Sequence, residues 1–156
     1  KGRGTYGKKW ISSKGNLFVS IFFPLKSNYP SFSEFSLINP LIVIDVIKSL
    51  CDKKKINLKF PNDILINKKK VCGILQEFVT LERRKFLIVG IGLNIVSNPV
   101  IKNKYKATNI LQECKKHLKI IDIIKLIITA YENFFVNLRL YRYADFKKKA
   151  EAIALN

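Results

Sequence analysis

The chain has 156 residues, of which 48% are apolar, enough for one domain with a sizeable core, and this excludes a disordered tail or a coiled-coil rod. Its net charge of +18 favours an anionic partner such as a nucleotide, a nucleic acid or an acidic protein surface, without separating these. The sequence contains no long uncharged apolar run and no signal peptide, so we expect a cytoplasmic protein that makes no membrane contact.

The first half of the chain predicts a strand, a helix and a second strand. Residues 16–23 mix aromatic and β-branched side chains between Gly15 and Pro24, which indicates a buried strand. A loop rich in Ser, Asn and Pro is expected over 26–36, and apolar residues at helical spacing predict a helix over about 40–54. A short strand over 56–60 should end at Pro61.

The second half predicts strands followed by helices. Residues 64–66 and 71–79 indicate two strands joined by a polar turn, and residues 86–95 a further buried strand, in which Gly90 and Gly92 mark close backbone approach. A short helix is expected around 109–116 and a long amphipathic one over about 121–140. This order predicts an α+β fold, with helices packed on a mostly antiparallel mixed sheet.

A glycine-rich segment opens the chain, and two familiar nucleotide motifs fail on it. Residues 2–7 satisfy G-x-G-x-x-G, but a strand follows where a dinucleotide site needs a helix. The P-loop pattern fails at Lys9, where a Ser or Thr hydroxyl is required. Two interpretations remain open: glycine N–H groups line an anion while Arg3, Lys8 and Lys9 supply positive charge, or the segment is a flexible basic tail.

Residues 59–63 (KFPND) place a lysine, an aromatic ring, a proline and two polar side chains at the end of a strand. Lys70 stands eleven residues after Lys59 and begins a second polar-apolar segment, KVCGILQE. Taken alone, these segments are most simply an ordinary turn and hairpin with solvated lysines.

Six segments taken together are far more specific. In order they are GRGTYGKKW, GNLFVS, KFPND, KKVCGILQE, GIGLN and KATNIL. This order resembles the biotin protein ligases (biotin–[acetyl-CoA-carboxylase] ligases), whose catalytic domain has a fold like that of class II aminoacyl-tRNA synthetases. The resemblance covers residues 1 to about 112. Lipoate–protein ligases share that fold but not the KWPND-type signature, and are the poorer match.

The resemblance implies an ATP-dependent ligase with ATP, biotin and Mg²⁺ (with ATP) as cofactors. Biotin is activated as biotinyl-5′-AMP, and the biotinyl group passes to a lysine of a biotin carboxyl carrier domain. Such chemistry requires two anions held together and phosphate charge neutralised, which positive groups and backbone amides supply. A lipoate-type acyl ligase and a basic nucleic-acid-binding module stay as alternatives.

The resemblance also implies roles for individual residues. Arg3 and Lys59 are expected to be catalytic, and no metal ligand is expected. Trp10 is expected to anchor the loop or to pack on the nucleotide. The residues expected to bind biotin, ATP or the adenylate are Gly2, Arg3, Gly4, Thr5, Lys59, Asn62, Asp63, Lys70 and Asn94.

The chain departs from the family pattern in two kinds of feature. Thr5 stands where the family has a second loop arginine that helps to retain the adenylate, and Phe60 replaces a tryptophan. The absence of Met suggests that residues 1–156 are a fragment of the catalytic domain, without upstream pocket residues or the small C-terminal β-domain. DNA binding is not supported, and a homodimer is possible within the family.

Cysteine and histidine carry little function in this sequence. Three widely spaced cysteines argue against a disulfide framework, so Cys51, Cys72 and Cys114 are expected to be buried, unreactive thiols. The single histidine, His117, is expected to be solvated, which leaves little basis for a zinc site or a serine-type triad.

Overall fold

The computed structural model describes residues 2–4, 7, 10–51, 54–100 and 106–155. One five-stranded sheet has the order β1-β5-β4-β3-β2, and every pair of neighbouring strands is antiparallel. The strands are β1 (Leu17–Pro24), β2 (Ile56–Lys59), β3 (Asp63–Ile66), β4 (Lys69–Leu81) and β5 (Arg84–Leu93). This sheet with its helices confirms the predicted α+β class.

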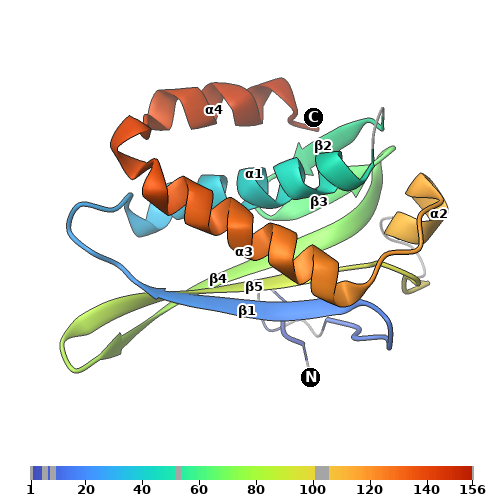
Figure 1. Cartoon of the computed structure of the whole chain (residues 1–156), viewed down its shortest axis with the longest axis horizontal. Helices are drawn as coiled ribbons and strands as arrows, with labels where there is room; N and C mark the ends of the chain where they lie inside the picture. The colour runs from blue at the N-terminus through green and yellow to red at the C-terminus, as the bar shows by residue number, and fades with distance from the viewer. Residues whose placement is uncertain (1, 5–6, 8–9, 52–53, 101–105, 156) are drawn as a thin grey trace.

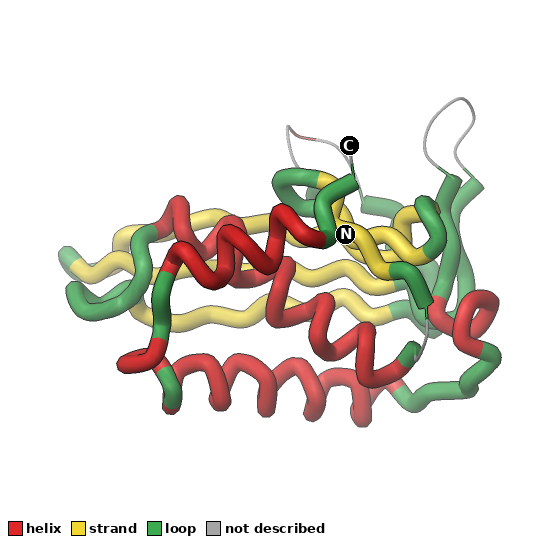
Figure 2. Tube along the Cα trace, turned by 90° about the horizontal axis from the view of Figure 1, so that it is seen from above, coloured by secondary structure: helices red, strands yellow, loops and turns green. Residues whose placement is uncertain are grey.

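The helices cover one face of the sheet (Figures 1 and 2). They are α1 (Phe32–Leu50), α2 (Ile110–Cys114), α3 (Ile120–Val136) and α4 (Tyr143–Ala152), with a 3₁₀ turn, η2 (Leu138–Leu140), before α4. Helix α1 contacts strands β2, β3 and β4 as well as helices α3 and α4, so it lies at the centre of the core. Among the described residues, no helix is long and apolar enough to cross a bilayer.

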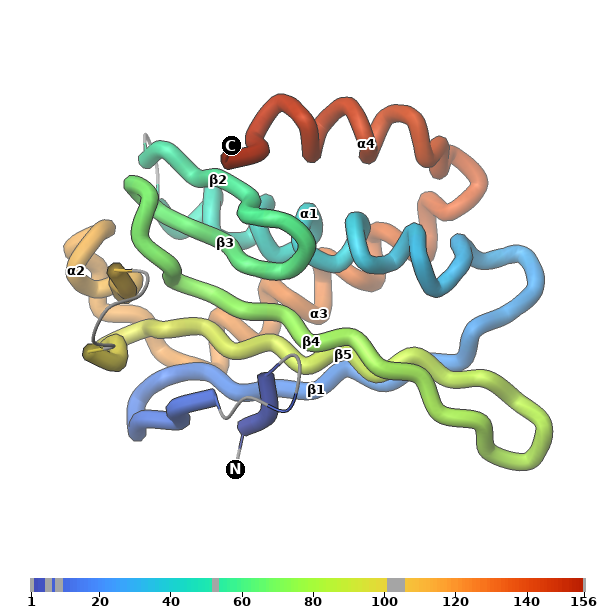
Figure 3. The backbone as a smooth tube through the Cα atoms, turned by 180° about the vertical axis from the view of Figure 1, so that it is seen from behind, coloured from blue at the N-terminus to red at the C-terminus, as the bar shows by residue number. Residues whose placement is uncertain are grey.

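The opposite face of the sheet carries no helix and is crossed by the N-terminal segment (Figure 3). Side chains alternate between the two faces along each strand. In β5 the residues Leu87, Val89, Ile91 and Leu93 are buried, while Phe86, Ile88, Gly90 and Gly92 are partly exposed. The glycines therefore lie on the helix-free face, where a cavity forms.

The first helix begins eight residues earlier than the sequence predicts. The expected loop over 26–36 contains its start, because Ser31 and Glu34 form a capping box. The Ser31 hydroxyl accepts from the Glu34 N–H at 3.3 Å, and the Glu34 carboxylate accepts from the Ser31 N–H at 2.8 Å. Pro40, where the sequence predicts the helix to start, lies buried inside it, and the helix ends at Leu50 rather than near residue 54.

The expectation of three separate thiols is wrong for two cysteines. Cys51 follows α1, Cys114 ends α2, and a disulfide joins them across Cα atoms 5.2 Å apart. Wide spacing in the sequence concealed this contact, since the fold returns residue 114 to the end of the first helix. Cys72 is a buried free thiol, and burial raises its pKa, so this cysteine agrees with the prediction.

Candidate active site

A pair of opposed glycines forms the floor of the site. Gly73 of β4 and Gly92 of β5 are directly opposite each other, and the indole of Trp10 lies against both. A Cβ at Gly73 would come within 2.5 Å of the Trp10 ring, and one at Gly92 within 2.6 Å. Only glycine therefore admits the ring at this depth, which supports the interpretation of Trp10 as an anchor of the N-terminal segment.

A cavity of about 940 Å³ opens on this helix-free face. The residues predicted from the sequence to bind ligand come from four separate segments, and the fold brings them to this one cavity. Those lining it are Gly2, Arg3, Gly4, Lys59, Asn62, Asp63, Lys70 and Asn94. Thr5 lies outside the described residues. Their individual roles stay predictions.

Lys70 and Asp63 form an ion pair on one wall of the cavity. Asp63 begins β3 and Lys70 lies near the start of the adjacent β4, and the Lys70 Nζ is 2.7 Å from Asp63 Oδ1. The same Nζ lies 5.1 Å from the centre of the Trp10 ring, a cation–π contact. The Asp63 carboxylate and the Trp10 ring together hold the Lys70 ammonium at the cavity wall. The side chains of Lys70 and Asp63 are both only partly exposed.

The KFPND turn is fixed to the neighbouring strand through Asn62. The Asn62 side-chain N–H donates to the Ile74 carbonyl at 2.9 Å, and the Ile74 N–H donates to the Asn62 carbonyl at 3.0 Å. Lys59 ends β2 immediately before this turn and lines the cavity. Asn62 therefore holds the turn in place, and Lys59 is positioned by a strand rather than by a loop.

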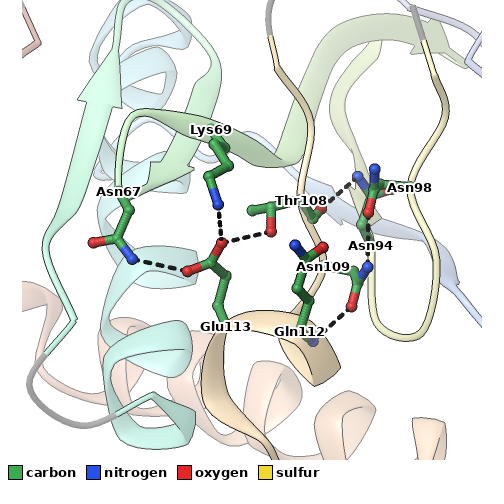
Figure 4. Close-up of polar contacts among 8 residues, drawn as sticks. All are labelled: Asn67, Lys69, Asn94, Asn98, Thr108, Asn109, Gln112 and Glu113. Carbon is green, nitrogen blue, oxygen red and sulfur yellow. Dashed lines mark hydrogen bonds and ion pairs between the residues drawn. The ribbon is translucent and has the colours of Figure 1, made fainter.

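Asn94 lines the cavity and carries a buried acceptor that the described part of the chain leaves without a partner. It follows β5, and its side-chain N–H donates to the Thr108 carbonyl at 3.1 Å (Figure 4). Its Oδ1 is buried and has no hydrogen-bond partner among the described residues. Because a buried carbonyl oxygen without a partner is costly, this atom is, within the described chain, an unsatisfied acceptor of a residue that lines the cavity.

Glu113 of α2 fixes the segment that closes this end of the cavity. Its carboxylate accepts hydrogen bonds from Asn67 at 2.8 Å, Lys69 at 2.9 Å and the Thr108 hydroxyl at 2.7 Å (Figure 4). Burial opposes ionisation, but the three hydrogen bonds outweigh it and hold the pKa of Glu113 below its usual value. Next to it, backbone bonds at 2.9 Å join Lys70 to residues 106 and 108.

Arg3 makes an ion pair that the motif pattern does not reveal. Its Nη2 lies 2.7 Å from Oε2 of Glu77, on β4. Glu77 lies four residues beyond Gly73, so strand alternation alone places both on one face. Strand alternation could therefore have placed Glu77 on the face of the cavity from the sequence alone. Nothing in the sequence indicates that Glu77 pairs with Arg3. Gly73 was likewise missed, although it stands within the GIL segment.

Residues 1–94 match the Biotin/lipoate A/B protein ligase family, and the chain belongs to this family. It is 32% identical over 148 residues to "Biotin--protein ligase 2" of Arabidopsis thaliana, covering 86% of this chain and 42% of that protein. It is 28% identical to the "Bifunctional ligase/repressor BirA" of Bacillus subtilis, covering 99% of this chain and 49% of that protein. The chain thus spans about half the length of these relatives.

Solved structures show the same fold. The biotin protein ligase from Aquifex aeolicus in complex with biotin and ATP has a TM-score of 0.81 and 26% identity, over 99% of this chain and 64% of that one. The Leishmania major enzyme in complex with biotinyl-5-AMP has a TM-score of 0.82 and 26% identity, over 99% and 67%. The expected resemblance to biotin ligase catalytic domains is therefore confirmed at the level of family and fold.

Proposed function

We propose that this chain is the catalytic part of a biotin–[carboxyl carrier protein] ligase. One observation carries this proposal: Arg3, Lys59 and Lys70, from three separate segments, line one cavity of the size that a nucleotide and a second small acid require. The solved relatives that bind biotin with ATP, or biotinyl-5-AMP, support the choice of ligands.

The described residues fit these ligands. Ile74, Leu75 and Ile88 give the cavity apolar walls suited to the ring and chain of biotin. Mg²⁺ would arrive with the phosphates of ATP, whose charge the three basic side chains also offset.

The reaction then proceeds in two displacements. A carboxylate oxygen of biotin attacks the α-phosphorus of ATP, and the bond to pyrophosphate breaks. An uncharged lysine amine of the carrier next attacks the acyl carbon, AMP leaves, the nitrogen gives up one proton to the solvent, and an amide forms. Lys59 and Lys70 stabilise the charge that gathers on the phosphate, since preformed positive groups need no reorganisation at that moment. The carrier lysine supplies the second nucleophile, so the chain itself needs none.

Exchange of labelled pyrophosphate into ATP tests the first step. We expect exchange that depends on biotin and not on lipoate, and a loss of about 100-fold or more in Lys59→Ala, because a charge-stabilising group is removed. Lys55→Ala is the matched control, since Lys55 is exposed and just precedes the same strand. Unchanged exchange in Lys59→Ala would contradict the catalytic role proposed for Lys59. Exchange with lipoate would favour the lipoate-type alternative.

A further inference from the structure

The carboxylate of Glu77 faces the same cavity as the groups assigned to ligand binding, although it carries a charge that would repel an anion. It lies on the helix-free face of β4 and lines the cavity together with Arg3. An unpaired carboxylate here would weaken the binding of any phosphate ligand. Its contact with Arg3 at 2.7 Å removes that repulsion.

The Arg3–Glu77 pair also fixes the N-terminal segment at a second point. The first point is the Trp10 ring, which lies against Gly73 and Gly92. The backbone N–H of Trp10 donates to the Gly2 carbonyl at 3.0 Å, and this bond keeps Gly2 beside Trp10. Glu77 lies four residues along β4 from Gly73, or about 13 Å at the usual rise of a strand. The segment is thus held to the sheet at two separated places.

We propose that Glu77 is a positioning residue that holds the Arg3 guanidinium at the mouth of the cavity, where Arg3 retains the bound biotinyl-adenylate. A guanidinium has five N–H donors in a fixed plane, so a carboxylate on one edge leaves other donors for a phosphate. The inference rests on the proposed function for the identity of the ligand. The placement of Arg3 by Glu77 stands independently of it.

The requirement for such a residue follows from the exposure of Arg3. Its side chain is 72% exposed, so without a partner it would sample many rotamers, and ordering it on ligand binding would cost affinity. Glu77, at 39% exposure and fixed on a strand, restricts those rotamers before the ligand arrives. Retention of the adenylate therefore depends on Glu77 through Arg3 and not through direct contact.

The ligand-dependent test measures how fast preformed biotinyl-adenylate dissociates from the whole chain. We expect Glu77→Gln to increase the dissociation rate about threefold to fivefold, in keeping with a partly exposed ion pair. In an Arg3→Gln background the same change should not increase the dissociation rate, because there is no guanidinium to position and removal of the unpaired carboxylate relieves its repulsion of the phosphate. An equal effect of Glu77→Gln in both backgrounds, or no effect in either, would overturn the proposal.

A ligand-free test separates this inference from the proposed function. Trp10 is the single tryptophan of the chain, so its fluorescence anisotropy reports the mobility of the N-terminal segment alone. Glu77→Gln and Arg3→Gln should lower the anisotropy equally, and Glu82→Gln, a change on the exposed turn between β4 and β5, should leave it unchanged. If the anisotropy does not fall, the placement of Arg3 by Glu77 is wrong even if the adenylate binds.

An exchange of the two charges completes the design. In the double variant Arg3→Glu with Glu77→Arg, the pair can form again, so the Trp10 anisotropy should return to that of the original chain. Adenylate dissociation should stay fast, because the guanidinium now extends from the strand. If the exchanged pair restored slow dissociation as well, Glu77 and Arg3 would act only by anchoring the segment. A chain that binds no adenylate but passes the anisotropy test would contradict the proposed function alone.

Discussion

The contact of Trp10 with Gly92 shows how much a single missing side chain contributes to this site. The ring lies where a Cβ of residue 92 would be, and its Nε1 is buried with no hydrogen-bond partner among the described residues. Packing against two glycines, together with the Lys70 ammonium, therefore holds the ring in place of a hydrogen bond. A methyl group at this point would force the ring away from the sheet.

We expect Gly92→Ala to displace Trp10 and leave the fold intact, since residue 92 does not need a left-handed backbone conformation. Trp10 emission should shift to longer wavelength, and adenylate affinity should fall about tenfold as the N-terminal segment loses its anchor. Gly90→Ala is the matched control on the same strand, because its Cβ would make only ordinary contacts, at 3.7 Å with Leu75. Equal emission shifts in both variants would contradict the proposal that packing of Trp10 on Gly92 anchors the N-terminal segment.

At the scale of residues, eight of the nine residues predicted to bind ligand line one cavity, because they stand in short ordered segments of the sequence. KFPND and the GIG glycines could be identified as they stand, and the fold brings them together. The Arg3–Glu77 and Lys70–Asp63 pairs could not be derived, since each depends on a distance across the sheet. The place of Ala107 at the cavity wall depends on its neighbour Thr108 and on Glu113, whose partners Asn67 and Lys69 are distant in sequence.

Helix α2 is too short to be stable alone, so its attachment to the hairpin of β3 and β4 decides its position. Asn109 caps it by accepting from the Gln112 N–H at 2.8 Å, and Glu113 holds it to Asn67 and Lys69 (Figure 4). These polar bonds keep Thr108 and Asn94 in place at the end of the cavity. Helix α2 therefore stabilises this end of the cavity through Thr108 and Asn94, although the helix itself lies outside the cavity.

We expect Glu113→Gln to lower the free energy of unfolding by about 1–3 kcal/mol at neutral pH, because a hydrogen-bonded carboxylate is lost. The folded pKa of Glu113 is lower than that of the unfolded chain, so its stabilisation is full above about pH 4.5 and is lost as the pH falls below that value. Denaturant unfolding at several pH values checks this. The variant should lose less stability than the original chain between neutral and acidic pH.

Glu132→Gln is the control for that experiment, as Glu132 is exposed on α3. If Glu113→Gln and Glu132→Gln showed the same stability and the same pH dependence, the Glu113 cluster would contribute nothing.

At the scale of elements, the strands were predicted more accurately than the helices. Each predicted strand lies within a few residues of an observed one, because alternation and turn residues mark its ends. The start of α1 was misplaced because Ser, Asn and Pro indicate a loop, while Ser31 and Glu34 make a cap that only their mutual contact reveals. The disulfide between α1 and α2 was missed for the same reason.

For the whole molecule, the net charge of +18 raises the question of whether nucleic acid is the true partner. Charge alone produces binding that weakens steeply with salt, since each phosphate contact releases a counterion. An adenylate held in a cavity has one phosphate and many short-range contacts, and so responds little to salt. The two kinds of binding are thus distinguished by their salt dependence.

Between about 50 and 200 mM salt, we expect duplex DNA affinity to fall at least about 100-fold and biotinyl-adenylate affinity to change less than about threefold. Titration of both ligands on the same chain measures the two slopes. A sequence-specific DNA affinity that resists salt, with no adenylate binding, would favour the nucleic-acid module.

The two outer strands of the sheet differ in how they end. Residues 153–155 run along the outer edge of β2: the Leu58 N–H donates to the Ile153 carbonyl and the Leu155 N–H to the Leu58 carbonyl, both at 2.9 Å. Among the described residues, no strand pairs with the outer edge of β1. A sheet with two open edges can add copies without limit and grow into a fibre. With β2 covered, edge-to-edge assembly through the described residues would end at a closed pair, because that part of each copy has one edge to offer and uses it once.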